Sequence, residues 1–182
     1  PLRVLAFTHK STPLTELNRF FIPEEERSSR LADLKEKFGL EELVYIATCN
    51  RIEFVWSSAE RCEDSFLRNF FAVLQPSWND QDISFAIRHA MVYQGNQALD
   101  HLFRVASSLD SLVVGEREII TQVRKAYDQA KADGLTGDLI RLVVQATINA
   151  AKRVYTETRI AANPVSIVSL AERKLRALHL PK

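Results

Sequence analysis

The chain has 182 residues, of which 46% are hydrophobic and 26% are charged, and its formal net charge is +1. A chain of this size buries one sizeable core without disulfides, and it contains neither an apolar run long enough to span a bilayer nor a signal-peptide pattern. We therefore expect a soluble, cytoplasmic protein that uses no membrane, and the small net charge decides nothing about acidic partners.

The first strands are predicted from apolar runs. Residues 2–8 are typical of a short strand, and Pro23 followed by three glutamates favours the start of a helix. Residues 43–47 form a continuous apolar run that fits a central strand, and apolar and polar residues alternate over residues 52–56. These two strands most simply form a hairpin.

The turn of this hairpin consists of Cys49 and Asn50. Tight hairpin turns demand a positive φ, which asparagine tolerates, so we expect Asn50 to adopt it. A helix over residues 66–74 and a strand within residues 83–93 follow. The predicted order is β-α-β-β-α-β.

This order matches the ferredoxin-like split β-α-β arrangement, an antiparallel sheet with two helices on one face. We assign it to residues 1–95 and expect an all-helical layer over residues 96–160. Residues 161–182 predict the start of a further long helix with nothing left to pack against, so we expect an α+β chain cut from a longer one. None of the five glycines forms a phosphate-binding loop, so we expect no nucleotide site in this segment.

The two cysteines have different sequence contexts, and neither belongs to a Cys/His set suited to zinc. Cys49 ends a buried strand, where Arg51 is the nearest charge that could activate its thiol as a nucleophile. The alternative is a small apolar turn residue, and the sequence alone leaves both interpretations open. Cys62 precedes Glu63 and Asp64, whose charges disfavour a thiolate, so we interpret it as structural.

His101 lies near the start of a predicted helix and is either a satisfied edge histidine or an acid/base group. Arg141, Lys152 and Arg153 give the helical half a basic character that would suit phosphate contacts or a solvated face.

Several ordered segments resemble glutamyl-tRNA reductase of the tetrapyrrole pathway. They are residues 48–53 (TCNRIE), 101–106 (HLFRVA) and 109–116 (LDSLVVGE), with further similarity at residues 9–13, 122–127, 151–154 and 156–158. That family joins a catalytic N-terminal domain, a spinal helix, an NADPH-binding domain and a dimerisation domain. The resemblance implies that residues 161–182 begin the spinal helix and that the last two domains are missing.

The resemblance also implies a reaction. Cys49 attacks the ester of glutamyl-tRNA, releases the tRNA and holds glutamate as a thioester, which NADPH reduces to glutamate-1-semialdehyde. Because NADPH binds a missing domain, this segment is not expected to complete the reduction. Glutamate-1-semialdehyde aminomutase is an implied partner, and the full-length enzyme is implied to be a homodimer.

The resemblance assigns residue roles one by one. Cys49 and His101 are catalytic, and the implied substrate-binding residues are Thr48, Arg51, Glu53, Ser111 and Glu116. A guanidinium suits bidentate recognition of a carboxylate, so Arg51 is expected to select the substrate. Two departures from the usual family pattern are Ser108, where glycine is common, and Arg117-Glu118, where Pro-Gln is common.

Two alternatives belong to other functional classes. One is a non-catalytic tRNA-binding module that uses the basic helical half, with the hairpin only as scaffold. The other is a thiol hydrolase of small esters, which would turn over simple esters without preferring glutamyl groups.

Overall fold

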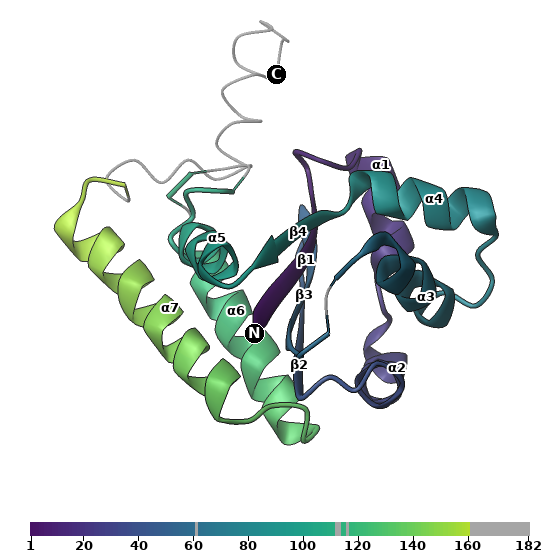
Figure 1. Cartoon of the computed structure of the whole chain (residues 1–182). Coiled ribbons are helices and arrows are strands. Elements are labelled where there is room, and N and C mark those ends of the chain that lie inside the picture. The colour runs from purple at the N-terminus through teal and green to yellow at the C-terminus, as the bar shows by residue number, and fades with distance from the viewer. Residues whose placement is uncertain (61, 112–113, 116, 161–182) are drawn as a thin grey trace, which may run out of the picture.

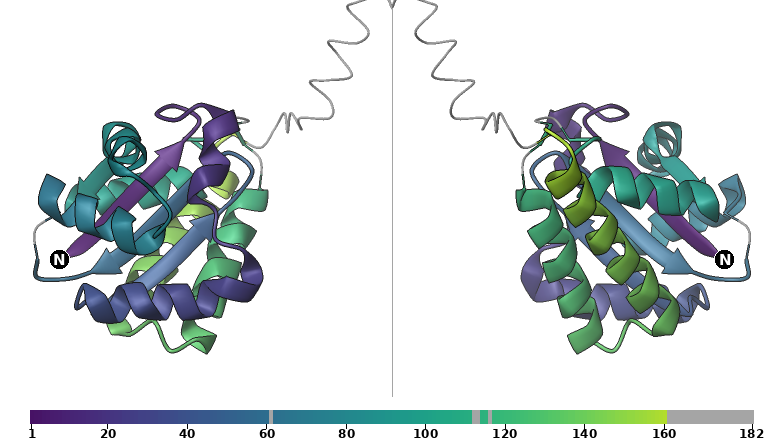
Figure 2. Two further views of the ribbon diagram at one scale, coloured as in Figure 1. Left: turned by 90° about the vertical axis from the view of Figure 1, so that its right-hand side faces the viewer. Right: turned by 90° about the vertical axis from the view of Figure 1, so that its left-hand side faces the viewer.

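The structure, a computed structural model, describes residues 1–60, 62–111, 114, 115 and 117–160. The elements in chain order are β1 (Leu2–Thr8), α1 (Leu14–Leu17), the 3-10 helix η1 (Asn18–Phe20), α2 (Glu24–Lys37), β2 (Glu42–Ala47), β3 (Arg51–Ser57), α3 (Asp64–Leu74), α4 (Asp80–His89), β4 (Met91–Gln94), α5 (Asn96–Ala106), α6 (Glu118–Ala132) and α7 (Asp138–Glu157). Helices α1 to α4 cover one face of the sheet and α5 to α7 cover the other (Figures 1 and 2).

The sheet has the strand order β2-β3-β1-β4, and every neighbouring pair is antiparallel. At its centre Leu5 of β1 lies opposite Phe54 of β3 and Val92 of β4. The first three expected strands are confirmed: β1 has the predicted bounds, β2 begins one residue earlier than predicted, and β3 extends one residue further at each end. The expected helical half is confirmed as α5, α6 and α7.

The strand expected within residues 83–93 is confirmed as β4, but the helix before it was not predicted. Most of this segment belongs to α4, and β4 occupies only its end. Asn79 starts the helix, because its side chain accepts hydrogen bonds from the backbone N–H groups of Gln81 (2.9 Å) and Asp82 (3.0 Å). The Asp82 carboxylate accepts one from Asn79 N–H at 3.1 Å, which completes a capping box.

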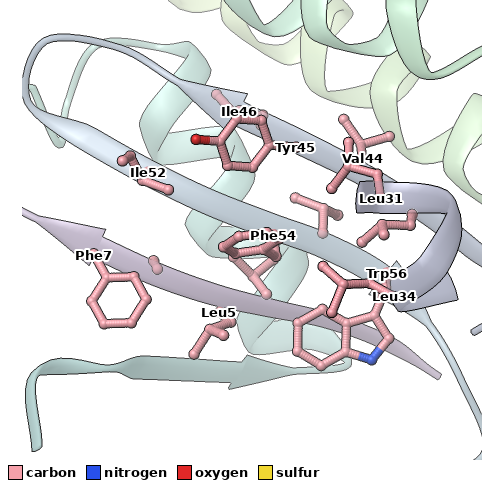
Figure 3. Close-up of a cluster of buried hydrophobic side chains, with 14 of the residues drawn as sticks. Leu5, Phe7, Leu31, Leu34, Val44, Tyr45, Ile46, Ile52, Phe54 and Trp56 are labelled. Carbon is pink, nitrogen blue, oxygen red and sulfur yellow. The ribbon is translucent and has the colours of Figure 1, made fainter. Parts of the chain in front are cut away.

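Strand β3 has two different faces because successive side chains of a strand point to opposite sides. Ile52, Phe54 and Trp56 belong to the buried core that includes Leu31 and Leu34 of α2 (Figure 3). Aromatic rings continue this core toward α3, where Phe70 lies 5.3 Å from Phe54 and 6.0 Å from Trp56, measured between ring centroids. The alternate β3 residues therefore face α5 to α7.

A carboxylate from the sheet fixes the start of α7. Glu42 accepts hydrogen bonds from the backbone N–H groups of Gly137 (2.7 Å), Leu139 (3.1 Å) and Ile140 (2.9 Å). These groups have no partner within the helix, and negative charge is favoured at this helix end. A β-carbon at position 137 would lie 3.2 Å from the Glu42 carboxyl carbon, so glycine allows the close approach.

The helix predicted over residues 161–182 lies outside the described residues. Within the part of the chain that the structure describes, no helix is both long and apolar enough to cross a membrane. The same residues contain no cluster of His, Cys, Asp and Glu able to hold a metal ion.

Candidate active site

The turn between β2 and β3 presents Cys49 to solvent. Thr48 N–H donates to the carbonyl of Arg51 (2.9 Å), and the Thr48 hydroxyl bonds the Asn50 side chain (3.1 Å). From β1, His9 N–H donates to the carbonyl of Asn50 (3.1 Å). These bonds hold the backbone on both sides of an exposed thiol.

The positive φ expected for Asn50 was wrong. Among the described residues other than glycine, only Ser108 has a positive φ, which is 58°. Side-chain and backbone hydrogen bonds around Thr48 close the turn without a positive φ instead. The expectation considered backbone sterics alone and left out the threonine hydroxyl, which forms a local turn of its own.

Directly after the turn, a buried network of charged groups begins. Arg51 Nη1 donates to Glu53 Oε1 (2.6 Å), and His101 Nε2 lies 3.1 Å from Glu53 Oε2. Arg51 Nη2 donates to the backbone carbonyl of Asp110 and lies 3.9 Å from its carboxylate, which also pairs with Lys10. We call Arg51, Glu53 and His101 the buried triad.

The buried triad is almost free of solvent. The side chains of Arg51 and Glu53 are 0% exposed and that of His101 is 4% exposed. Burial alone would raise the pKa of Glu53, but His101 and Arg51 outweigh it and hold this pKa below its ordinary value. Glu53 is therefore a carboxylate at neutral pH. Since buried ion pairs rarely increase stability over an apolar core, such a group marks a functional-site candidate.

His101 is held on its face as well as its edge. Tyr93 of β4 stacks on it with ring centroids 4.2 Å apart and planes 14° apart. A cavity of about 600 Å³ borders this stack, and its walls are Val92, Tyr93, Asn96, Gln97, Asp100, His101, Arg104 and Asp110. Of the two sequence-based alternatives, His101 is thus a hydrogen-bonded histidine that also lines a cavity.

The structure adds neighbours that the sequence reasoning left off the site. The Nδ1 atom of His9 is buried and has no hydrogen-bond partner. Burial is the main cause that lowers the pKa of His9, and the positive charges of Arg51 and Lys10 lower it further. Lys10 and Asp110 lie in segments that carried the family resemblance, so the sequence offered a signal for both. Tyr93 carried no such signal.

Two of the three remaining predicted site residues are half-buried, and the third is not among the described residues. Thr48 is half-buried beside Cys49, and Ser111 is half-buried and follows Asp110 in the chain. Glu116 lies outside the described residues. The sequence therefore identified the members of the buried triad, but it did not reveal their mutual contacts.

The two departures from the family pattern have local structural roles. Ser108 adopts its positive φ and accepts a hydrogen bond from Gly115 N–H through its hydroxyl (3.0 Å). The Arg117 guanidinium lies 5.5 Å from the ring centroid of Tyr155. Glu118 begins α6, where its negative charge suits the helix end.

The second cysteine lies in a different environment. Burial raises the pKa of the Cys62 thiol to about 11, and the nearby Arg3 offsets this only in part. Cys62 therefore stays a protonated thiol at neutral pH, in agreement with its structural interpretation.

The fold and the site together define an α+β domain that presents an exposed cysteine beside a buried charged network. The chain belongs to the family of glutamyl-tRNAGlu reductase N-terminal domains, whose family profile matches residues 5–158. This confirms the resemblance found in the sequence.

Individual relatives agree with the family. The glutamyl-tRNA reductase of Syntrophus aciditrophicus is 38% identical over 166 residues, covering 90% of this chain and 38% of the relative. The glutamyl-tRNA reductase of Methanopyrus kandleri is 37% identical over 179 residues, covering 96% of this chain and 40% of the relative. The solved structure of glutamyl-tRNA reductase from Methanopyrus kandleri is similar to this chain with a TM-score of 0.73 and 35% sequence identity. The match covers 95% of this chain and 40% of the chain in that structure. The chain thus spans about two fifths of these relatives.

Proposed function

We propose that this chain is the catalytic N-terminal part of a glutamyl-tRNA reductase acting in tetrapyrrole biosynthesis. The observation that carries the proposal is the exposed Cys49 thiol, held by a fixed turn that runs directly into the buried triad. Family membership supports the substrate, because the relatives are named for glutamyl-tRNA.

The proposed step is an acyl transfer. The thiolate sulfur of Cys49 attacks the carbonyl carbon of the glutamyl ester, a C–S bond forms and the C–O bond to the terminal ribose breaks. The ribose oxygen leaves and takes a proton, so the products are a glutamyl thioester and free tRNA. Thiolate is both a good nucleophile and a good leaving group, which makes the thioester a suitable intermediate.

Five residues have proposed supporting roles. His101 supplies the acid/base group, a role that rests on the family resemblance, and its ring lines the cavity described above. Arg51 lends positive charge near the turn, but both of its terminal nitrogens are bonded within the chain and only Nε lacks a partner. Bidentate binding of a substrate carboxylate would therefore require Arg51 to exchange one of these bonds. Thr48, Ser111 and Glu116 remain proposed pocket residues.

The described residues do not fit NADPH. Dinucleotide folds hold the cofactor at the ends of parallel strands through a Gly-rich turn, whereas all strand pairs in the described sheet are antiparallel. Residues 9–13, which follow β1, contain no glycine. We therefore derive only the acyl transfer from this chain and propose that NADPH reduction to glutamate-1-semialdehyde depends on another domain of the complete enzyme.

The finer organisation is also proposed. The strand order and antiparallel pairing support a ferredoxin-like unit over residues 1–95. Residues 96–160 would be the helical part of the catalytic domain and residues 161–182 the start of a spinal helix. A homodimer and an aminomutase partner are proposed on the family resemblance, and a cytoplasmic location on the sequence composition.

The decisive experiment uses glutamyl-tRNA labelled in the amino acid, without NADPH. We expect label on the protein or release of free glutamate with the unmodified chain and with Cys62→Ser, and neither with Cys49→Ser. tRNA binding without either product would instead favour the non-catalytic module. Turnover of simple esters with no preference for glutamyl groups would favour the small-ester hydrolase.

The charges of the helical half give little support to the binding-module alternative. Arg141 bonds Asp138 through Nε (3.1 Å) and Nη2 (3.0 Å), and Arg153 bonds Glu157 (2.9 Å). These pairs neutralise two of the cations that were candidates for phosphate contacts.

A further inference from the structure

Two contacts at right angles to each other hold the His101 ring. Its edge meets the Glu53 carboxylate at 3.1 Å, and its face lies on Tyr93 at a centroid distance of 4.2 Å with nearly parallel planes. The ring can turn about its Cβ–Cγ bond, and such a turn would swing Nε2–H away from the Glu53 oxygen and weaken the preference for one tautomer. A stacked face removes this freedom, because rotation would separate the two rings.

Tyr93 is placed by the sheet and by a short connection. In the β1–β4 ladder it lies opposite Val4, and α5 begins two residues after β4 ends. Gly95 makes this connection with φ 56°, and its N–H donates to the carbonyl of Leu2 (2.8 Å). The backbone therefore fixes Tyr93 relative to the first two turns of α5, which carry His101.

The edge contact decides which ring nitrogen carries the proton. Glu53 is ionised, so its oxygens only accept hydrogen bonds, and His101 Nε2 must be the donor. In the neutral imidazole the other nitrogen, Nδ1, is then the acceptor. A ring fixed in this orientation keeps Nδ1 available as a base at a constant position.

We propose that Tyr93 is a positioning residue, which holds the His101 ring in the plane and tautomer needed for proton transfer at the Cys49 site. This inference rests on the proposed acyl transfer, since His101 is there the acid/base group. Tyr93 acts only through His101, and its hydroxyl has no required part.

The test compares Tyr93→Phe, which keeps an aromatic face, with Tyr93→Leu and Tyr93→Gln, which do not. Tyr93 is half-buried, so at least one of these variants should fold, as near-ultraviolet circular dichroism would check. The chain offers a matched control at Phe85→Leu, which removes a second stack, between Phe85 and His89 (4.0 Å, 26°), on α4.

The first readout is the nitrogen NMR spectrum of His101, which reports the tautomer and titration of the ring without any substrate. The second is the rate of Cys49-dependent glutamate release as a function of pH. In Tyr93→Leu we expect mixed His101 tautomers and release slowed about 3- to 10-fold at saturating glutamyl-tRNA. Tyr93→Phe and Phe85→Leu should match the unmodified chain in both readouts.

An unchanged His101 tautomer and rate in both Tyr93→Leu and Tyr93→Gln would overturn the proposal. Slow release in Tyr93→Phe would also overturn it, because the hydroxyl would then be required. If the unmodified chain releases no glutamate at all, the proposed function fails, and the NMR spectra still decide separately whether Tyr93 fixes the ring.

Discussion

Replacing Glu53 with glutamine removes the carboxylate that both Arg51 and His101 contact. Arg51 would keep a fully buried charge, with the Asp110 carboxylate 3.9 Å away as its closest remaining anion. Breaking a buried ion pair from one side costs about 3–5 kcal/mol, and the remaining Asp110 contact favours the lower end. For a domain of this size we therefore expect the melting temperature to fall by about 6–12 °C.

The measurements are thermal unfolding and urea unfolding of Glu53→Gln at pH 7.5, both followed by circular dichroism. Glu157→Gln is the matched control, because it also removes one acidic partner of an arginine, but from an exposed pair (2.9 Å, side chains 75% and 57% exposed). Its midpoint should not move measurably. Replacing Arg51 with leucine in the Glu53→Gln background should restore part of the lost stability, since the unpaired charge is gone.

The dependence on pH gives a second test. The pKa of Glu53 is lowered in the folded chain, so its contribution is complete above the ordinary carboxyl pKa of about 4.3 and is lost as the pH falls through the folded value. The stability gap between the unmodified chain and Glu53→Gln should thus be constant at neutral pH and begin to narrow as the pH falls below about 4. A gap below about 1 kcal/mol at pH 7.5, or one unchanged by acid, would refute this account of the buried triad.

Three further perturbations have expected outcomes. Glu42→Gln leaves the α7 start with one acceptor oxygen, so we expect a loss of about 1–3 kcal/mol and faster amide exchange at Leu139; unchanged exchange would contradict the cap. Ser108→Gly and Ser108→Ala both lose the hydroxyl contacts, but only glycine relieves the positive φ, so the glycine variant should be more stable by about 1 kcal/mol in urea; equal midpoints would contradict this. At pH 8, iodoacetamide should label the folded chain at Cys49 and not at Cys62. The Cys62 thiol has a pKa of about 11, which keeps it about 100-fold less ionised than an ordinary thiol, so rapid labelling of Cys49→Ser would contradict this.

The elements that the sequence predicted well are those specified by local patterns. Apolar runs located β1 and β2, because a strand buried on both faces needs such a run, and alternating apolar residues located β3, each within one residue. Helix α4 was missed although Asn79 and Asp82 have the spacing of a capping box. Its apolar residues, such as Ile83, were interpreted with the period of a strand instead.

The site was predictable only as a set of residues. Cys49 and Arg51 are close in sequence, so the turn could be inferred from the hairpin alone. The contact between Glu53 and His101 joins residues 48 positions apart, and the Arg51–Asp110 bond joins residues 59 positions apart. Such contacts depend on how α5 packs on the sheet, which no local pattern specifies.

The two faces of β3 restrict how the chain can change in length. Adding or deleting one residue in the turn that carries Cys49 would shift the register of β3 and reverse every side chain along it. Phe54 and Trp56 would then face α5 to α7, while Arg51 and Glu53 would enter the aromatic layer. Engineering of the site should therefore vary exposed side chains and keep the loop length.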